Sequence, residues 1–187
     1  MIIFFGMCLL AALAEPLIIS LFTDKWEKSV IYLQVFCFAL MFDHICKLNL
    51  NILYVKGRSD LVLRLEIIKK TISISMIIAA IPFGVLAICI SRAIYTQIAI
   101  IINTYYTGKL FGLGYLSQIK DFAKYLIYSF IAVLPALFLT LSPLNPVLIL
   151  IIGACVSCFI YWILLCKDVN FTSTVNLVKR NQKYIFQ

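Results

Sequence analysis

Apolar residues run through most of this chain in long stretches, and short polar segments separate them. Between Lys124 and Lys167 no side chain carries a charge. Two apolar runs, Tyr125 to Leu141 and Val147 to Cys166, fill this interval and are divided by the segment Ser-Pro-Leu-Asn-Pro. An apolar run of about 18 residues or more can cross a hydrocarbon core of about 30 Å. The two runs therefore predict a pair of membrane-spanning helices joined by a tight turn.

The same reasoning along the whole chain predicts an all-α integral membrane protein with six spanning helices. Lipid offers the backbone no hydrogen bonds, so each span has to satisfy them internally, as a helix does. Only Pro82, Phe83 and Gly84 separate the third span from the fourth, and one continuous kinked helix is the alternative. We favour a hairpin, because residues 67–106 are too many for one crossing. The expected spans are 2–22, 29–54, 67–83, 84–106, 122–141 and 147–166.

Composition agrees with a lipid-embedded chain. Of its 187 residues, 64% are hydrophobic and only 13% are charged, and the mean hydropathy is +1.06. The formal net charge of +8 would suggest nucleic acid as the partner of a soluble protein. In a membrane protein the position of the charges is more informative than their sum, and we expect no nucleic-acid partner.

Lysine and arginine gather in alternate connections between the expected spans. By the positive-inside rule these connections are cytoplasmic, which also places both ends of the chain in the cytoplasm. Residues 167–187 are expected to form a basic cytoplasmic tail at the membrane surface. The basic residues are Lys56, Arg58, Arg64, Lys69 and Lys70 in one connection, Lys109, Lys120 and Lys124 in another, and Lys167, Lys179, Arg180 and Lys183 after the last span.

The first expected span has no polar segment before it. Ala12-Leu13-Ala14 resembles a signal-peptide cleavage site, but the positively charged region that precedes such a site is missing. We expect instead that the chain is a piece of a larger membrane protein.

Ionisable side chains inside a span are costly, so each needs a partner or a function. In the second span Asp43, Lys47, Asn51 and Tyr54 fall within about 80° of one another, and His44 lies close to the same stripe. Asp43 and Lys47 stand four residues apart and can neutralise each other. Alternatively this face lines a wet cavity, in which Asp43 or His44 carries a proton and Lys47 meets an anionic group.

The fourth span has a similar face, formed by Arg92, Thr96 and Asn103. Arg92 lies near the outer end of this span. It can snorkel to the interface, or it can face inward, where its planar guanidinium suits phosphate oxygens. In the first span Glu15 precedes Pro16, which suggests a kink beside a carboxylate and either a gating element or only a bend.

Residues typical of an active site or a metal site are not evident in the sequence. The chain has one histidine, and its seven cysteines lie mostly in apolar runs, where free cysteine packs as a small hydrophobe. Cys155 and Cys158 have metal-ligand or redox spacing, but no second pair accompanies them. We therefore expect no enzyme, metal or cofactor. Transport needs only helices, a polar interior stripe and two arrangements around a site.

Three segments have an order and spacing that look specific. They are Asn49–Lys70 with its Lys-Gly-Arg-Ser-Asp turn; Asn103-Thr-Tyr-Tyr with Lys109, Gly114-Tyr115 and Gln118-Ile-Lys-Asp121; and Ala14-Glu-Pro-Leu-Ile with Leu21-Phe22 and Trp26. Together they cover about residues 10–125. This part of the chain resembles the carboxy-terminal half of the Wzx-like polysaccharide flippases, in the multidrug/oligosaccharidyl-lipid/polysaccharide exporter superfamily.

The resemblance implies a complete protein of about twelve to fourteen helices in two bundles around a central cavity, with this chain supplying the second bundle. It implies transfer of undecaprenyl-pyrophosphate-linked oligosaccharide across the bacterial inner membrane, for O-antigen, capsule or exopolysaccharide, by cation-coupled alternating access. Lys47 and Arg92 would meet the pyrophosphate, although no family motif fixes either residue as a ligand. The missing amino-terminal bundle, or a partner chain, would close the cavity.

These considerations give two sets of candidate residues. Lys47, Asn51, Arg92 and Asn103 would line the cavity, and Asp43, His44 and Glu15 would couple transport to an ion or a proton. The expected partners are lipid-linked oligosaccharide and membrane lipids. Alternatives are a cation-coupled small-molecule antiporter of the same superfamily, a membrane enzyme such as a glycan polymerase, and a non-catalytic assembly subunit. The enzyme would normally need a long outer loop or a catalytic set of His and carboxylates.

Overall fold

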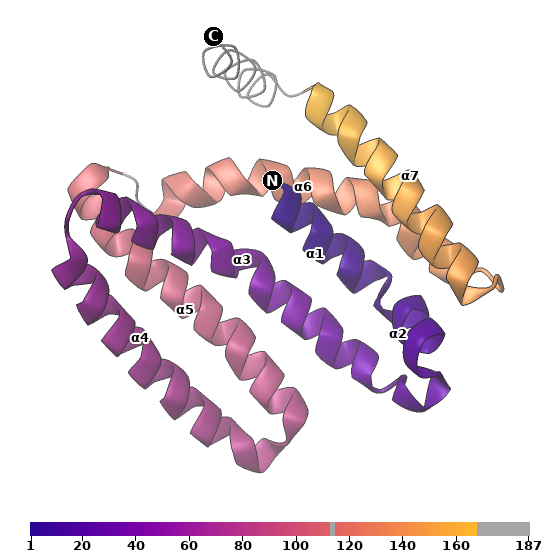
Figure 1. Cartoon of the computed structure of the whole chain (residues 1–187), viewed down its shortest axis with the longest axis horizontal. Helices are drawn as coiled ribbons and strands as arrows, with labels where there is room; N and C mark the ends of the chain where they lie inside the picture. Colours follow the sequence, from indigo (N-terminus) through magenta and orange to yellow (C-terminus); the bar gives the residue numbers. More distant parts are fainter. Residues whose placement is uncertain (113–114, 168–187) are drawn as a thin grey trace, which may run out of the picture.

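A computed structural model describes residues 1–112 and 115–167, and within these residues every regular element is helical. The helices form one broad layer (Figure 1). The expected basic tail beyond Lys167 lies outside the described residues. The elements are α1 (Ile2–Ala12), α2 (Ala14–Phe22), a 3-10 turn (Asp24–Trp26), α3 (Ser29–Val55), α4 (Ser59–Ala80), a second 3-10 turn (Ile81–Phe83), α5 (Val85–Phe111), α6 (Tyr115–Thr140) and α7 (Pro146–Cys166).

Four of these helices are long and apolar enough to span a membrane, and α1 and α2 together make a fifth if the bent pair counts as one span. The expected number of six is therefore not confirmed. The difference lies in α4, which begins at Ser59, earlier than the expected start at Ile67. This helix carries charged residues before and just inside the expected span, namely Asp60, Arg64, Glu66, Lys69 and Lys70.

The first expected span is divided into α1 and α2, which meet at an angle of 63°. Pro16 explains the position of the break. Its ring lacks an N–H and would clash with the carbonyl of Ala12, four residues earlier, and α1 ends at Ala12. Pro16 itself lies in the first turn of α2, where a missing N–H costs nothing. The sequence-based expectation of a kink near Glu15 agrees with this bend.

The chain reverses between α4 and α5, so the hairpin that we favoured from the sequence is present. The two helices run side by side (Figure 1), and the reversal is made by the 3-10 turn and Gly84. Gly84 has φ of 87° and ψ of −178°, a conformation that essentially only glycine adopts. The turn before α7 is equally well defined, because the Asn145 side chain caps α7 by accepting a hydrogen bond of 3.0 Å from the Val147 N–H.

The helices form two groups. One contains α3, α4 and α5; the other contains α1, α2, α6 and α7, and α1 also packs against α3. The main core lies where α1 meets α3, α6 and α7 and contains the fully buried Phe4. Phe5 stacks on Tyr161 of α7 with a centroid separation of 4.2 Å. Many large apolar side chains face outward, including Phe159 and Trp162 on α7, as expected for a surface in contact with lipid.

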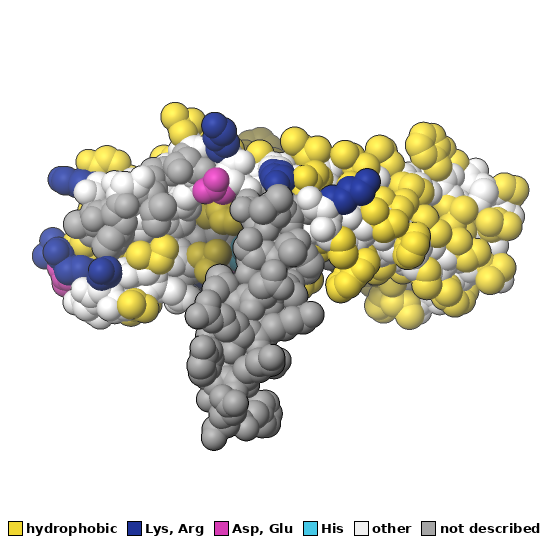
Figure 2. Space-filling view, turned by 90° about the horizontal axis from the view of Figure 1, so that it is seen from above, with side chains coloured by type: hydrophobic (Ala, Val, Ile, Leu, Met, Phe, Trp, Pro, Cys, Tyr) yellow, Lys and Arg dark blue, Asp and Glu magenta, His cyan; other side chains and the backbone are white. Residues whose placement is uncertain are grey.

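The ends of the helices alternate between two edges of the layer. The connection from α3 to α4, the end of α5, the start of α6, Met1 and the end of α7 lie along the upper and left edge in Figure 1. The remaining connections lie along the lower and right edge. The basic connections therefore share one edge, and Figure 2 shows Lys and Arg side chains over one part of the molecule and mostly apolar side chains over another.

Candidate functional site

A carboxylate of α3 lies between two cations at the contact of α3 with α5. Asp43 Oδ2 is 3.3 Å from Lys47 Nζ on the same helix, and Asp43 Oδ1 is 3.6 Å from Arg92 Nη2 on α5. The pairing of Asp43 with Lys47, one of the two alternatives raised from the sequence, is present in the structure. The three side chains together carry a net charge of +1, so one positive charge is left over for an anion.

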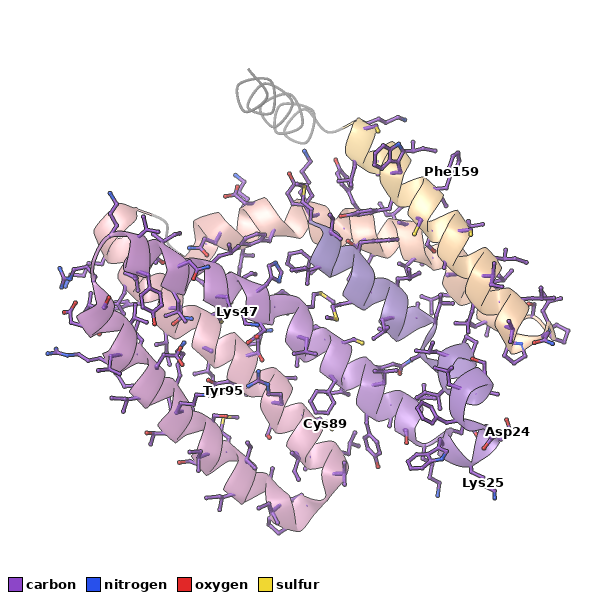
Figure 3. The ribbon with its side chains drawn as sticks, viewed as in Figure 1. Asp24, Lys25, Lys47, Cys89, Tyr95 and Phe159 are labelled. Atoms are coloured by element: carbon purple, nitrogen blue, oxygen red, sulfur yellow. The ribbon has the colours of Figure 1, made fainter. Side chains whose placement is uncertain are left out.

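Arg92 turns toward the neighbouring helix rather than away from the layer. Its side chain is about one third exposed, and its guanidinium carbon lies 5.2 Å from the centre of the Tyr95 ring on the same helix. Tyr95 and Lys47 lie on adjoining parts of α5 and α3 (Figure 3). The contact with the ring and the ion pair with Asp43 together hold the guanidinium against α3.

A second ion pair lies on α4. Glu66 and Lys69 form a close ion pair one helical turn apart, and Lys69 is buried. The pair lies on α4, which packs against α5, the helix that carries Arg92. This pair was not among the expected candidate residues. The spacing of Glu66 and Lys69, three residues apart, could have predicted it, because this spacing puts opposite charges on one helix face.

The polar stripe predicted on α3 lies on an exposed face of the layer. The Lys47 side chain is 73% exposed, and Asn51 and Tyr54 are exposed as well. Asp43, at the edge of the stripe, is the member that contacts α5. The stripe is therefore open to whatever covers this face, and within the described helices it does not line a closed cavity.

Asn103 does not share this exposed face. It is fully buried between α5 and α3, where its side-chain N–H donates a hydrogen bond of 3.4 Å to the carbonyl of Cys46. Its side-chain oxygen has no hydrogen-bond partner among the described residues. The sequence placed Asn103 with Arg92 on one face of the helix, but the structure gives Asn103 a role in packing α5 on α3.

His44 and Glu15 lie apart from Asp43's ion pairs. The His44 ring packs against the rings of Phe4 and Phe122, with centroid separations of 4.8 and 6.1 Å, and neither ring nitrogen has a partner among the described residues. Glu15 is exposed beside the bend between α1 and α2 and lines a small hollow near the turn before α7. The three candidate coupling residues are thus in three different surroundings.

An amide cluster that the sequence analysis did not identify joins α3, α5 and α6. Asn49 and Gln118 exchange two hydrogen bonds of 2.8 Å, and the Thr107 hydroxyl donates a third, also 2.8 Å long, to the Asn49 oxygen. The Asn49 amide also donates to the Ile45 carbonyl at 2.9 Å. Asn49 is buried, so this cluster fixes the relative position of three helices.

Among the described residues, no three His, Cys, Asp or Glu side chains come together in a way that would hold a metal ion. Cys155 and Cys158 are both exposed on α7 and are not disulfide-bonded.

Comparison with known proteins gives no relative, because no family model, no curated protein and no solved structure matches this chain. The helices and their apolar surfaces indicate the class, a multi-pass α-helical membrane protein. The resemblance to polysaccharide flippases rests on the sequence segments quoted above, and assigning a function depends on those segments and on the geometry around Asp43.

Proposed function

We propose that this chain forms one helical bundle of a transporter that flips undecaprenyl-pyrophosphate-linked oligosaccharide across the bacterial inner membrane. Both ends of the chain are on the cytoplasmic side in this proposal. The observation that carries it is the arrangement of Arg92 and Lys47 on either side of Asp43. Charges at this depth of apolar helices are costly and are kept where they bind a substrate or an ion.

The chemistry of the two cations suits a pyrophosphate. A guanidinium presents two N–H groups to a pair of phosphate oxygens, and an ammonium adds a mobile point charge. In the absence of substrate Asp43 neutralises part of this charge. An arriving pyrophosphate would compete with Asp43 for Arg92 and Lys47, and the displaced carboxylate would then be able to take up a proton or a cation. Substrate binding and ion binding are thereby linked through one residue.

The exposed position of the stripe requires a second surface. The Lys47 and Tyr54 side chains are exposed, and a lysine at this depth of the membrane is costly when it faces lipid. We therefore propose that another helical bundle, from a further segment or from a partner chain, covers this face. The substrate cavity would lie between the two bundles, as in other transporters built from two repeats.

The test is glycan export in cells that depend on this transporter. Arg92→Ala and Lys47→Ala should each reduce export and cause lipid-linked oligosaccharide to accumulate in the cytoplasmic leaflet. The loss should be about tenfold or more in apparent substrate affinity, because a charge-assisted hydrogen bond contributes about 1.5–3 kcal/mol. Arg92→Lys should restore only part of it, since the bidentate geometry is lost. Lys70→Ala, at an exposed lysine of α4, is the matched control and should export normally.

Membrane levels of each variant have to be equal for the comparison to count. Normal export by both Arg92→Ala and Lys47→Ala would remove these residues from the mechanism. Unchanged glycan display together with greater drug sensitivity would favour the small-molecule antiporter. A chain that supports export only as a stable partner of another bundle, with neither cation needed, would be an assembly subunit.

A further inference from the structure

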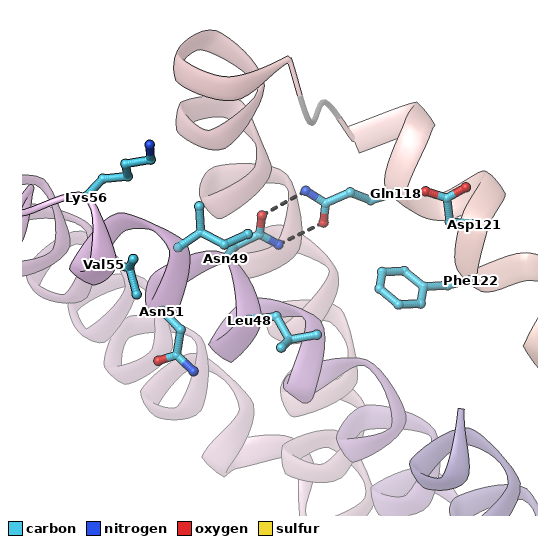
Figure 4. A pocket seen from close by; sticks show the side chains of 9 residues that line it. Leu48, Asn49, Asn51, Val55, Lys56, Gln118, Asp121 and Phe122 are labelled. Carbon is cyan, nitrogen blue, oxygen red and sulfur yellow. Dashed lines mark hydrogen bonds between the residues drawn. The ribbon is translucent and has the colours of Figure 1, made fainter. Parts of the chain in front are cut away.

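A hollow strip separates the first half of α6 from α3. The helix α6 packs closely on α1 and α7 but only lightly on α5. Two adjoining hollows result, of about 450 and 280 Å³, and both are lined by Gln118 and Phe122 of α6. We call the two together the α3–α6 groove; Figure 4 shows the larger one. It is separate from Asp43, Lys47 and Arg92, none of which lines it.

Most of the surface that faces into the α3–α6 groove is apolar. Leu48, Ile52 and Val55 of α3 line the larger hollow, and Ile45 of α3 and Leu126 of α6 line the smaller one. Hollows of about 300–1,000 Å³ with apolar walls and few polar groups are typical of ligand sites. Water would gain little from such walls, since a buried water usually needs about three hydrogen-bonding partners.

Two amide side chains within the groove already satisfy one another. Asn49 and Gln118 form their reciprocal pair across it, as Figure 4 shows, and Asn49 also binds the hydroxyl of Thr107. The pair bridges α3 and α6 where their backbones stand apart. Both helices are long and apolar enough to span a membrane, so the groove between them would be surrounded by hydrocarbon. A hydrocarbon chain is the natural occupant.

The end of the larger hollow is polar and lies at the basic edge of the layer. Asn51 and Lys56 line it at the end of α3, together with Asp121 of α6. The neighbouring connections carry more positive than negative charge, with Lys56 and Arg58 against Asp60 on one side, and Lys109, Lys120 and Lys124 against Asp121 on the other. Basic residues at a membrane surface attract anionic lipid headgroups.

We propose that the α3–α6 groove binds one acyl chain of an anionic phospholipid, whose phosphate lies at the basic edge beside Asn51 and Lys56. The lipid would fill the space that α6 leaves open and would hold the two groups of helices together. This site does not include Asp43, Lys47 or Arg92 and does not depend on the transported molecule.

The test uses the purified chain in vesicles that contain a trace of phosphatidylglycerol with a photoreactive group in its acyl chain. Cross-linked residues are located by mass spectrometry. Residues 45–55 and 118–126 should be labelled severalfold more than the exposed lipid-facing surface around Phe159. A phosphatidylcholine probe with the same acyl chain should label them severalfold less, and unlabelled phosphatidylglycerol should compete.

A variant that fills the groove provides the second arm. Ala123→Trp places a large ring in the smaller hollow and should lower labelling there severalfold. Ile131→Trp, at an exposed position farther along α6, is the matched control and should leave labelling unchanged. Competition by unlabelled lipid requires no variant, so it decides the matter even if Ala123→Trp fails to fold.

Three results would overturn the proposal. They are equal labelling of the groove and of the surface around Phe159, equal labelling by the phosphatidylcholine probe, and displacement of phosphatidylglycerol by polyprenyl phosphate at much lower concentration. The last result would assign the groove to the carrier lipid of a glycan. None of them depends on Arg92 or Lys47, so the two proposals fail or succeed separately.

Discussion

At the scale of single residues, the two polar features of α3 point in different directions. Lys47 is exposed, and Asp43, one turn earlier, contacts Arg92 of α5. Asn49 lies on another side of α3, where it contacts Thr107 of α5 and Gln118 of α6. A helix that is polar on two sides does not reveal from its own sequence which side meets a neighbour. The partner of Asn49, Gln118, is also 69 residues away, so no local pattern pairs them.

Asn49→Ala should destabilise the protein through the partners it leaves behind. The Thr107 hydroxyl and the Gln118 amide would lose buried hydrogen bonds, which costs about 1–3 kcal/mol in the free energy of unfolding. Thermal unfolding in detergent measures the change. Asn51→Ala, two residues away on the exposed face, should change the stability by no more than about 0.5 kcal/mol. Equal effects of the two substitutions would contradict the role given to the amide cluster.

The candidate residues were predictable only in part for the same reason. Opposite charges four residues apart indicate the Asp43–Lys47 pair, because that spacing is a property of the helix itself. The ion pair between Asp43 and Arg92 depends on how α3 and α5 pack, and helical geometry alone does not fix that packing. The burial of Asn103 against Cys46 likewise depends on the neighbouring helix.

At the scale of helices, proline and glycine set the breaks that apolar composition conceals. Residues 2–22 are apolar enough to look like one span, yet Pro16 ends α1 at Ala12 and produces the 63° bend. The helix α4 begins before the expected span at Ile67, because a helix continues through charged residues when they pair with each other, as Glu66 and Lys69 do. Hydropathy indicates which part of a helix lies in lipid, and it does not indicate the residue at which the helix begins.

Gly84→Ala should weaken the hairpin between α4 and α5. An added Cβ meets no neighbouring atom, so the expected cost of about 1–3 kcal/mol comes only from the backbone conformation at φ of 87°. Gly6→Ala is the matched control, because its Cβ would also meet open space, but it lies within α1. That change should stabilise the helix by about 0.5–1 kcal/mol. An equal fall in the unfolding temperature of both variants would show that the reversal does not depend on Gly84.

At the scale of the whole molecule, the alternation of basic and nearly neutral connections agrees with the two edges of the helical layer. The sequence predicted this alternation because charge placement records which side of the membrane a connection occupies. The number of spans was less predictable, since α4 is helical and packed on α5 but too charged to be assigned as a span from its composition. Whether α4 crosses the membrane decides how many times the chain does.

Site-directed labelling with a membrane-impermeant thiol reagent in intact cells tests the central claim most directly. One cysteine is introduced at a time into the chain. We expect a cysteine at Ser59 or Lys120 to react only after the cells are opened, and a cysteine at Asp24 or Leu144 to react in intact cells. The unmodified chain, with its seven cysteines, gives the background. Reaction of Ser59→Cys and Lys120→Cys on opposite sides of the membrane would contradict the account.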